Sequence, residues 1–455
     1  MRKYRLNHKC MLLTAGIFFM FSHVLLNPAF CENNMQRIEI PSSPNPVGSG
    51  ARALGMGGAF IAIADDATAA SWNPGGLIWL DQLEISVVGA AFHRIEDNSF
   101  RIYPDADGNQ TVSQFNLNYL SAAFPFSFKD FNMVVSLNYQ HLYDFTRKWD
   151  FSLKESGEEW YHQDVDYRSE GGLSAIGFAY CVQINKRISL GLTFNIWDDG
   201  ISKNEWEQNT YQWGQGTDGK DKFVEEIRTF DKYTFSGYNF NFGLLWKRVN
   251  DSNLTIGAVI KTPFEADMEH EHSFHDISQY YELPSMFDQV SSDSFNENAT
   301  LDMPLSYGIG FSYRFSDHFT ASLDIYRTEW GDFVLTDSNG RETSPVSGKV
   351  ITESDIDPTH QVRIGGEYLG FEASGYVFPV CFGAFYDPAP AEGSPDDFFG
   401  ISIGSGITDG KRFTFDVAYQ YRFGNDVGGS ILKDWKFSQD VSEHTVYSSF
   451  IMYFK

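Results

Sequence analysis

Large apolar residues alternate with small or polar residues in many short segments between positions 82 and 454. In the segment 306–313 the odd positions hold aromatic or aliphatic side chains, and the even positions hold serine or glycine. Residues 188–196 and 413–421 repeat this alternation. A period of two residues places the two sets on opposite faces of a β-strand. The pattern therefore predicts an all-β chain.

The number of predicted strands and the lengths of their connections indicate a barrel. We expect fourteen strands, at residues 82–94, 111–127, 130–145, 171–184, 187–199, 234–247, 253–264, 299–315, 318–334, 359–370, 372–386, 396–408, 411–424 and 443–454. Short turns such as Asp409-Gly410 alternate with long polar loops such as 200–233 and 265–298. A soluble sandwich would share the alternation within strands, but this arrangement of connections is typical of outer-membrane barrels. We predict a 14-stranded antiparallel transmembrane β-barrel over residues 81–455, with long loops outside the cell and both termini in the periplasm.

The composition favours a protein that contacts lipid. Aromatic residues make up 16% of the chain, which is more than a water-soluble globule needs, and many stand at the ends of predicted strands, where membrane interfaces favour them. A formal net charge of −26 disfavours a nucleic-acid partner, because phosphate would be repelled. We expect a monomer in outer-membrane lipid, with no nucleic-acid partner and no cofactor.

Residues 1–31 have the features of a secretory signal peptide. Basic residues precede an apolar run at 11–26, and Ala29 and Cys31 supply the small residues of a cleavage site. Lipidation at Cys31 is the alternative, and Phe30 disfavours it because a small residue is preferred there. The mature chain then keeps Cys181 and Cys381, which we predict to be free thiols that face the lumen from distant strands.

Residues 32–80 precede the first strand and are predicted to form a hatch that plugs the lumen. Five glycines lie among small residues between Gly48 and Gly58. A second motif, Asn73-Pro74-Gly75-Gly76, places a proline with fixed φ beside two residues without Cβ. We predict that this corner gates passage, and the alternative is a connector that only ends the plug.

Three motifs of the predicted hatch resemble a known family. They are Gly50-Ala51-Arg52-Ala53-Leu54-Gly55-Met56-Gly57-Gly58, Ala64-Asp65-Asp66-Ala67-Thr68-Ala69 and Trp72-Asn73-Pro74-Gly75-Gly76, and they look like the hatch of the long-chain fatty-acid transporter (FadL/TodX) family. Weaker strand motifs at 363–368 and 385–390 follow in the family's order. Two departures are Gly75, where the family has alanine, and Lys455 after the terminal aromatic residue.

The resemblance implies passive uptake of hydrophobic small molecules, such as long-chain fatty acids or aromatic hydrocarbons, across the outer membrane. Ligand capture would lie between the third and fourth long loops, and exit would lead through the wall near the third strand. Relatives with this barrel also bind protein cargo or act as scaffolds in secretion, and this alternative stays open.

The predicted capture site lies on the loops 200–233 and 265–298. Its residues share an apolar or aromatic character, and they are Trp206, Tyr211, Trp213, Phe223, Tyr280, Tyr281, Leu283, Met286, Phe287 and Val290. Pro284 suits the first turn of a helix, which would place Met286, Phe287 and Val290 on one face. The alternative is that these side chains only pack the two loops together.

Three further sets of polar residues are candidates for chemistry. Arg363 is the candidate partner for a ligand carboxylate, against the alternative of charges paired within a polar lumen. His270 and His272 would share one face of an extended strand, but their spacing matches no specific metal motif, and we expect a hydrated loop without metal. No serine stands at a recognised spacing to His141 or His360, so an enzyme is not expected.

Overall fold

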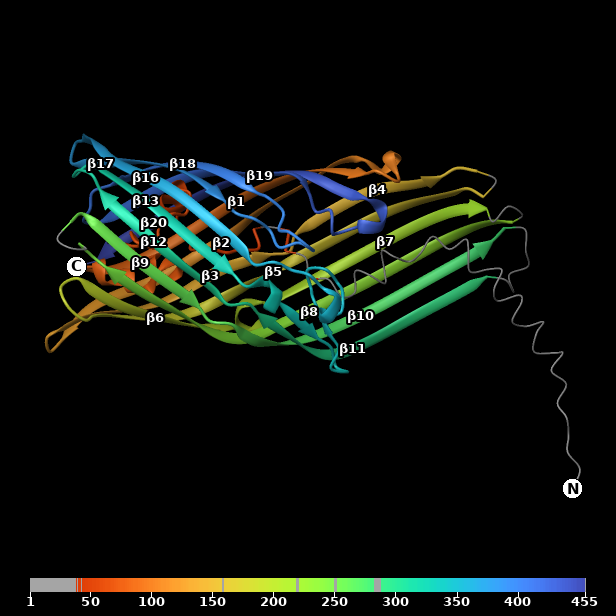
Figure 1. The fold of residues 1–455 in the computed structure, drawn as a ribbon, viewed down its shortest axis with the longest axis horizontal. Helices are drawn as coiled ribbons and strands as arrows, with labels where there is room; N and C mark the ends of the chain where they lie inside the picture. Colours follow the sequence, from red (N-terminus) through yellow and green to blue (C-terminus); the bar gives the residue numbers. More distant parts are fainter. Residues whose placement is uncertain are drawn as a thin grey trace, which may run out of the picture.

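The computed structural model describes residues 38, 40–41, 43–157, 159–217, 221–248, 252–281 and 288–454. The predicted signal peptide lies outside these residues. Within the described ranges, fourteen strands pair with their neighbours into a closed antiparallel ring (Figure 1). The last strand pairs with the first, and Ile85 lies opposite Met452. The predicted 14-stranded barrel is confirmed.

The barrel strands overlap all fourteen predicted ranges, but several are longer, and the strands at 161–183 and 222–246 begin ten and twelve residues before the predicted start. They are β1 (Leu83–Phe100), β2 (Gly108–Phe128), β3 (Phe131–Asp144), β5 (Tyr161–Gln183), β6 (Ile188–Trp197), β8 (Lys222–Trp246), β9 (Leu254–Lys261), β12 (Ser306–Arg314), β13 (Phe319–Thr328), β16 (Thr359–Ala373), β17 (Tyr376–Tyr386), β18 (Phe399–Thr408), β19 (Phe413–Val427) and β20 (Phe437–Phe454). The strand predicted at 299–315 is interrupted at Pro304, which cannot donate a backbone hydrogen bond.

The outer face of the barrel carries a belt of exposed apolar side chains. Its members include Phe124, Leu137, Phe178, Phe240, Phe242, Ile309, Ile325, Ile364, Phe382, Ile401, Ile403, Phe415 and Val446. Such a band would be unfavourable in water, and lipid-facing positions of transmembrane barrels alternate with inward polar ones in this way. The belt therefore marks the part of each strand that spans the membrane.

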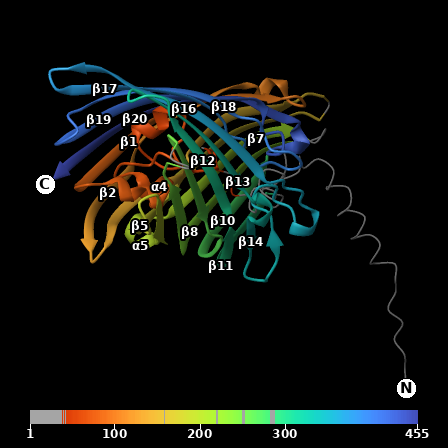
Figure 2. The ribbon, with the colours of Figure 1, turned by 60° about the vertical axis from the view of Figure 1, so that its left-hand side comes forward.

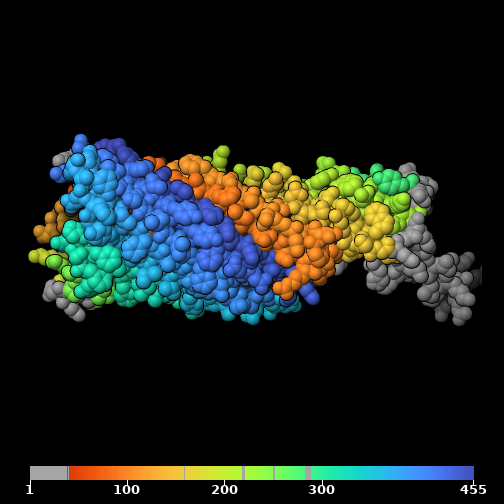
Figure 3. Space-filling model, turned by 90° about the horizontal axis from the view of Figure 1, so that it is seen from above, coloured from red at the N-terminus to blue at the C-terminus, as the bar shows by residue number. Residues whose placement is uncertain are grey.

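The same sheet continues the wall beyond the belt, and we call this part the extension. It adds the strands β4 (Arg147–Glu155), β7 (Glu205–Thr217), β10 (Phe264–Tyr280), β11 (Gln289–Met303), β14 (Val334–Thr336) and β15 (Glu342–Thr343). Pairing runs in the order β4-β5-β7-β8-β10-β11-β14-β15. Figure 3 shows the extension, in yellow and green, projecting beyond the blue strands.

The extension corrects the prediction of irregular long loops at 200–233 and 265–298. Strands β7, β8, β10 and β11 occupy most of both ranges. The outward positions of β10 are acidic, whereas its inward positions include buried Met268 and His270. The alternation with a period of two is therefore present in β10. Because its outward residues are polar, the sequence of this strand resembles that of a solvated loop.

Short helices fill the lumen and connect strands. The hatch contains α3 (Ala51–Gly55), α4 (Ala69–Trp72) and η1 (Pro74–Trp79), and the connections contain η2 (Pro104–Ala106), α5 (Asp199–Ser202), η5 (Trp330–Asp332), η6 (Ile351–Glu353) and η7 (Lys433–Trp435). Figure 2 shows α4, in red, enclosed by the strands. None of the helices in the described residues is long and apolar enough to cross a membrane.

The chain before the hatch runs along the lumen towards the long loops. The amide of Ile38 donates to the carbonyl of Pro345, in the loop that leads to β16, at 3.1 Å. Asn45 donates to the carbonyl of Pro388 at 2.6 Å. The first described residue therefore lies at the end opposite Phe454. The N-terminus itself lies outside the described residues, so its predicted place in the periplasm stays a prediction. An even strand number fixes only the strand ends and not the segment before them.

Candidate functional site

The hatch packs against the barrel wall with backbone against backbone. A Cβ added at Gly365 of β16 would lie 2.1 Å from the carbonyl oxygen of Met56, and one at Gly383 of β17 would lie 2.2 Å from the amide nitrogen of Gly57. Both distances are far below van der Waals contact, so these wall positions have no room for a side chain. Met56 and Gly57 therefore lie directly against the wall formed by β16 and β17.

Buried carboxylates of the wall hold the hatch by hydrogen bonds. Asp324 of β13 accepts from the backbone amides of Phe60 at 2.6 Å and Ile61 at 2.8 Å. Arg52 of α3 donates to both oxygens of Glu367 in β16, at 2.6 and 2.8 Å. Within the hatch, burial raises the pKa of Asp66, and Arg52 at 3.7 Å opposes part of that shift. These contacts fix the hatch in one position.

The predicted gating corner joins the hatch to β8. The Asn73 amide group donates to the carbonyl of Ile61 at 2.9 Å and to the carbonyl of Leu244 at 3.0 Å. Its oxygen accepts from the Gly75 amide at 3.0 Å. Pro74, Gly75 and Gly76 are buried as well. Hydrogen bonds therefore hold the corner both to the hatch and to β8. Its movement during passage stays a prediction.

An apolar cavity of about 90 Å³ lies above the hatch, on the side of the long loops, and we call it the upper cavity. Its apolar lining includes Ile38, Pro44, Phe333, Val346, Phe398 and Ile431. Its charged lining residues are Arg94, Arg147, Arg422 and Asp396. A neighbouring cavity of about 160 Å³ lies closer to the hatch and includes Arg363, Asp387 and Glu443 in its lining. The lumen thus offers apolar and cationic surfaces side by side.

The arginines of these cavities belong to one buried network, the arginine cluster. Its contacts are Arg94 with Glu96 at 2.8 Å and Glu443 at 3.3 Å, Arg147 with Glu96 at 3.0 Å, Arg422 with Glu443 at 3.0 Å and Asp387 at 3.1 Å, and Arg363 with Asp387 at 3.5 Å. In the described residues this network joins four guanidinium groups to three carboxylates, which leaves one positive charge in excess.

Arg363, the predicted carboxylate partner, lies at the edge of the cluster that contacts the hatch. Its Nη1 donates to the carbonyl of Gly57 at 3.0 Å, and its Nε donates to Gln361 at 3.1 Å. Its guanidinium also lies over the ring of Phe385, 4.9 Å from the centroid. A ligand carboxylate at Arg363 would compete with Asp387. Arg94, Arg147 and Arg422 were missed as a group because they are far apart in the sequence.

The described members of the predicted capture site range from buried to exposed. Trp206 is 1% exposed and stacks between Phe145 and Tyr233, at centroid distances of 4.5 and 4.8 Å. Phe223 of β8 and Tyr280 of β10 are brought together at 5.9 Å. The other described members, on or beside the extension strands, are Tyr211, Trp213, Tyr281 and Val290. Leu283, Met286 and Phe287 lie outside the described residues. Trp206 therefore fits the alternative in which aromatic residues pack the loops together.

A serine, a histidine and an aspartate lie close together in the structure, although their spacing in the sequence matches no recognised motif. Ser174 of β5 lies 3.0 Å from Nδ1 of His141, and Nε2 of His141 lies 3.5 Å from Asp144. The Ser174 hydroxyl is shared with Tyr139 at 2.9 Å, and the residue is only 3% exposed. A nucleophile must reach its substrate, so this group does not suggest hydrolysis.

Several solved structures share the fold of this chain. A FadL homologue of Pseudomonas aeruginosa is 14% identical with a TM-score of 0.56, over 90% of this chain and 99% of that chain. The toluene transporter TodX of Pseudomonas putida is 13% identical with a TM-score of 0.57, over 90% and 99%. The toluene transporter TbuX of Ralstonia pickettii is 13% identical with a TM-score of 0.50, over 90% and 100%. At such low identities the structural similarity establishes the fold, and it confirms the predicted resemblance.

The apolar belt and the closed ring of strands place this protein in the outer membrane of a Gram-negative bacterium, as a multi-pass β-barrel. A comparison with curated proteins gave no match. The family model described as BamG matches residues 56–370, which run from the hatch through β16. Since this match covers well over half of the sequence, the chain belongs to the BamG family.

Proposed function

We propose that the barrel admits hydrophobic small molecules passively from the outside, and that long-chain carboxylates suit it better than uncharged hydrocarbons. The observation that carries this proposal is the upper cavity with the arginine cluster at its side. An alkyl chain would lie against Phe333, Val346 and Phe398. A carboxylate would neutralise the excess positive charge, and a guanidinium group binds carboxylate in a planar, two-point geometry.

Passage beyond the cavity would require a change in the hatch or in the wall where Met56 packs against Gly365. An open cavity of about 470 Å³ lies beside β3, the third strand, and includes Leu117, Tyr139 and Gly172 in its lining. Pairing between β3 and β5 shifts register between His141 and Tyr143. These features support a lateral exit near the third strand, as the family resemblance implies.

Uptake of oleate by cells that carry the barrel tests the proposal. Val346→Trp should fill the upper cavity and reduce oleate uptake several-fold, whereas Val446→Trp, at a position 43% exposed on the outer face of β20, is the matched control. Oleyl alcohol, which lacks the charge, should enter more slowly than oleate. Oleate uptake equal to that of cells without the barrel, or unchanged in Val346→Trp, would reject the proposal.

A second candidate is a barrel that binds protein cargo or acts as a scaffold. The extension favours it, because eight paired strands or strand segments present a broad polar surface outside the membrane belt. Crosslinking in intact outer membranes separates the two candidates. A partner that is lost when charges on the outer face of β10 are reversed, with oleate uptake unchanged, would support the scaffold.

A further inference from the structure

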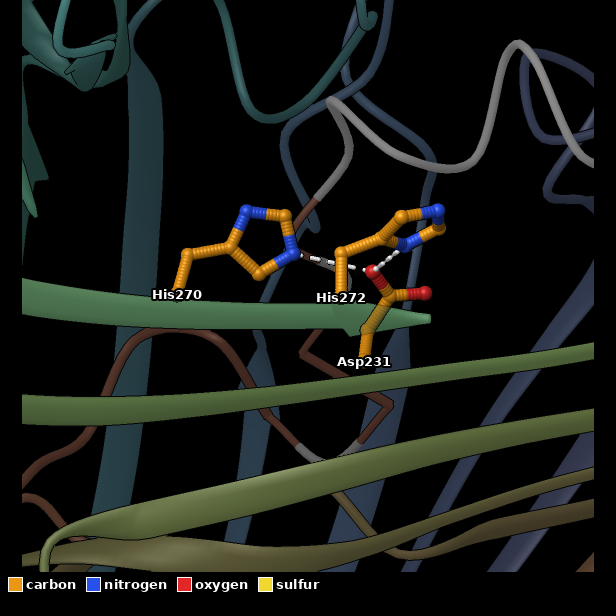
Figure 4. Close-up of side chains that lie close together, drawn as sticks. All are labelled: Asp231, His270 and His272. Atoms are coloured by element: carbon orange, nitrogen blue, oxygen red, sulfur yellow. Dashed lines mark hydrogen bonds and ion pairs between the residues drawn. The ribbon is translucent and has the colours of Figure 1, made fainter. Parts of the chain in front are cut away.

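Two histidines and an aspartate meet on the inner face of the extension, and we call them the His2Asp cluster. Asp231 of β8 is directly opposite His272 of β10 in the strand register, and His270 lies two residues before His272. One oxygen of Asp231, Oδ1, lies 2.9 Å from Nε2 of His270 and 2.8 Å from Nδ1 of His272. Figure 4 shows the three side chains pointing towards one another from the two strands.

The cluster is buried, and its rings are held by neighbours. Asp231, His270 and His272 are 6%, 5% and 2% exposed. The ring of Tyr233 stacks on His270 at a centroid distance of 4.3 Å, and the ring of Phe295 stacks on His272 at 4.8 Å. These contacts restrict both imidazoles to one orientation. Ligands that are fixed in advance lose little conformational entropy when they bind.

A second carboxylate, that of Glu297, lies on the side of His270 that faces away from Asp231. Oε1 of Glu297, on β11, lies 3.6 Å from Nδ1 of His270, the ring nitrogen that faces away from Asp231. The other Glu297 oxygen accepts from Ser338 at 2.6 Å. Metal-binding histidines commonly direct their second nitrogen to a carboxylate in this manner, which fixes the tautomer and raises the basicity of the ligand.

Within the described part of the chain, no lysine or arginine forms an ion pair with the carboxylates of the group. Asp231 and Glu297 bring two carboxylates to the buried side of the extension, and their described ion pairs at this place are with the two histidines. Lys232, the nearest lysine in the sequence, pairs instead with Glu205 and Glu207 of β7. A divalent cation between Asp231 and the histidines would balance these carboxylates.

We propose that Asp231, His270 and His272 bind a divalent first-row transition metal, with Zn²⁺ as the best match. The ligand atoms would be Oδ1 of Asp231, Nε2 of His270 and Nδ1 of His272, which lie within 4.8 Å of one another. Bonds of about 2.0–2.1 Å in a tetrahedral site separate neighbouring ligand atoms by roughly 3.3 Å. Small rotations of the three side chains reach that spacing, and the fourth position is left for water or another ligand.

The metal would join β8 to β10 in the part of the wall that lies outside the membrane belt. Outward neighbours on these strands are polar, for example Lys232 and Glu271, so lipid does not support the sheet here. A metal bound by residues of two strands stabilises their pairing, since the unfolded extension would not offer the same site. The extension would then be a metal-stabilised wall.

Metal binding by the full chain, purified in detergent without a polyhistidine tag and stripped with chelator, tests this proposal. Zinc titration followed by elemental analysis should give one equivalent per barrel. Asp231→Asn and His272→Ala should each weaken binding at least tenfold. His275→Ala is the matched control, because His275 lies on the same strand but is exposed. Cobalt should give the intense visible bands of a tetrahedral site in the wild type and the control.

Proteolysis supplies a readout that does not depend on the spectrum. Zinc should slow tryptic cleavage at Arg228, which is exposed on β8, several-fold in the wild type and in His275→Ala, but not in Asp231→Asn. An unchanged heat-modifiable band would show that each variant still forms the barrel. Absence of stoichiometric zinc, or equal binding by wild type and Asp231→Asn, would overturn the proposal and leave Asp231 as a hydrogen-bond acceptor only.

Discussion

Arg52 of the hatch and Glu367 of β16 form a two-point salt bridge, with Nε 2.6 Å from Oε1 and Nη2 2.8 Å from Oε2. Glu367 is buried, so its charge depends on this partner. Removal of one member of a buried pair costs about 3–5 kcal/mol, because the other charge is left without compensation. The pair is therefore a principal attachment of the hatch to the wall.

Arg52→Met should loosen the hatch without opening the ring of strands. We expect a several-fold rise in ion conductance across planar bilayers, because the free energy lost with the salt bridge weakens the contact between hatch and wall. Arg52→Met combined with Glu367→Met should bring the conductance part of the way back to the wild-type level, because the buried Glu367 charge is removed while Asp65 and Asp66 still lack Arg52 as a partner. Conductance of the single variant at the wild-type level would show that Asp324 and the backbone contacts suffice to hold the hatch.

Gly365→Ala should displace the hatch through sterics alone. The added Cβ would meet the Met56 carbonyl oxygen at 2.1 Å, and overpacking of this kind costs about 1–3 kcal/mol. Gly108→Ala is the control, because a Cβ at Gly108 meets nothing within 4 Å. The temperature at which the folded band converts to the unfolded band on gels should fall for Gly365→Ala and stay unchanged for Gly108→Ala. Equal temperatures for both would contradict the close approach.

Cys181 and Cys381 are free and buried, as predicted. Both pack in the cluster of apolar residues that includes the hatch, and Sγ of Cys181 lies 3.4 Å from the carbonyl oxygen of Gly75. Maleimide should therefore label neither thiol at an appreciable rate in the folded protein and both after heat unfolding. Rapid labelling of Cys181 in Asn73→Ala would report movement of the corner. A native mass lower by two hydrogens, assigned to this pair, would refute free thiols.

The alternation of side chains was sufficient to predict the barrel but not the extension. In the barrel, lipid requires apolar residues on the outer face, so the period of two is conspicuous. In β10 the outward residues are Glu265, Asp267, Glu269 and Glu271, and water accepts them equally well on a strand or in a loop. Only the pairing of β10 with β8 and β11 decides between the two.

The sites depend on contacts between residues that are distant in the sequence. His270 and His272 were recognised as sharing a face, but Asp231 reaches them through the register of β8 against β10. The arginine cluster likewise combines residues of β1, β4, β16 and β19. Local patterns establish which residues face the lumen, whereas strand stagger around the ring determines which of them meet.

The Asn73-Pro74 corner offers the most direct test of gating. Asn73 links three backbone segments, through Ile61, Leu244 and Gly75. Its side chain is fully buried, so its loss leaves the Ile61 and Leu244 carbonyls without these donors. An unsatisfied buried polar group costs about 1–3 kcal/mol. Pro74→Ala also releases the constraint on φ.

Asn73→Ala with Pro74→Ala should therefore free the corner while the closed strand ladder, which carries the stability of the barrel, remains intact. If the corner gates passage, uptake of a hydrophobic probe such as oleate should change at least several-fold, and the heat-modifiable band should persist. Gly108→Ala serves again as the variant without a packing effect. Wild-type uptake in the double variant would favour a simple connector, and loss of the folded band would show that the corner is needed for assembly.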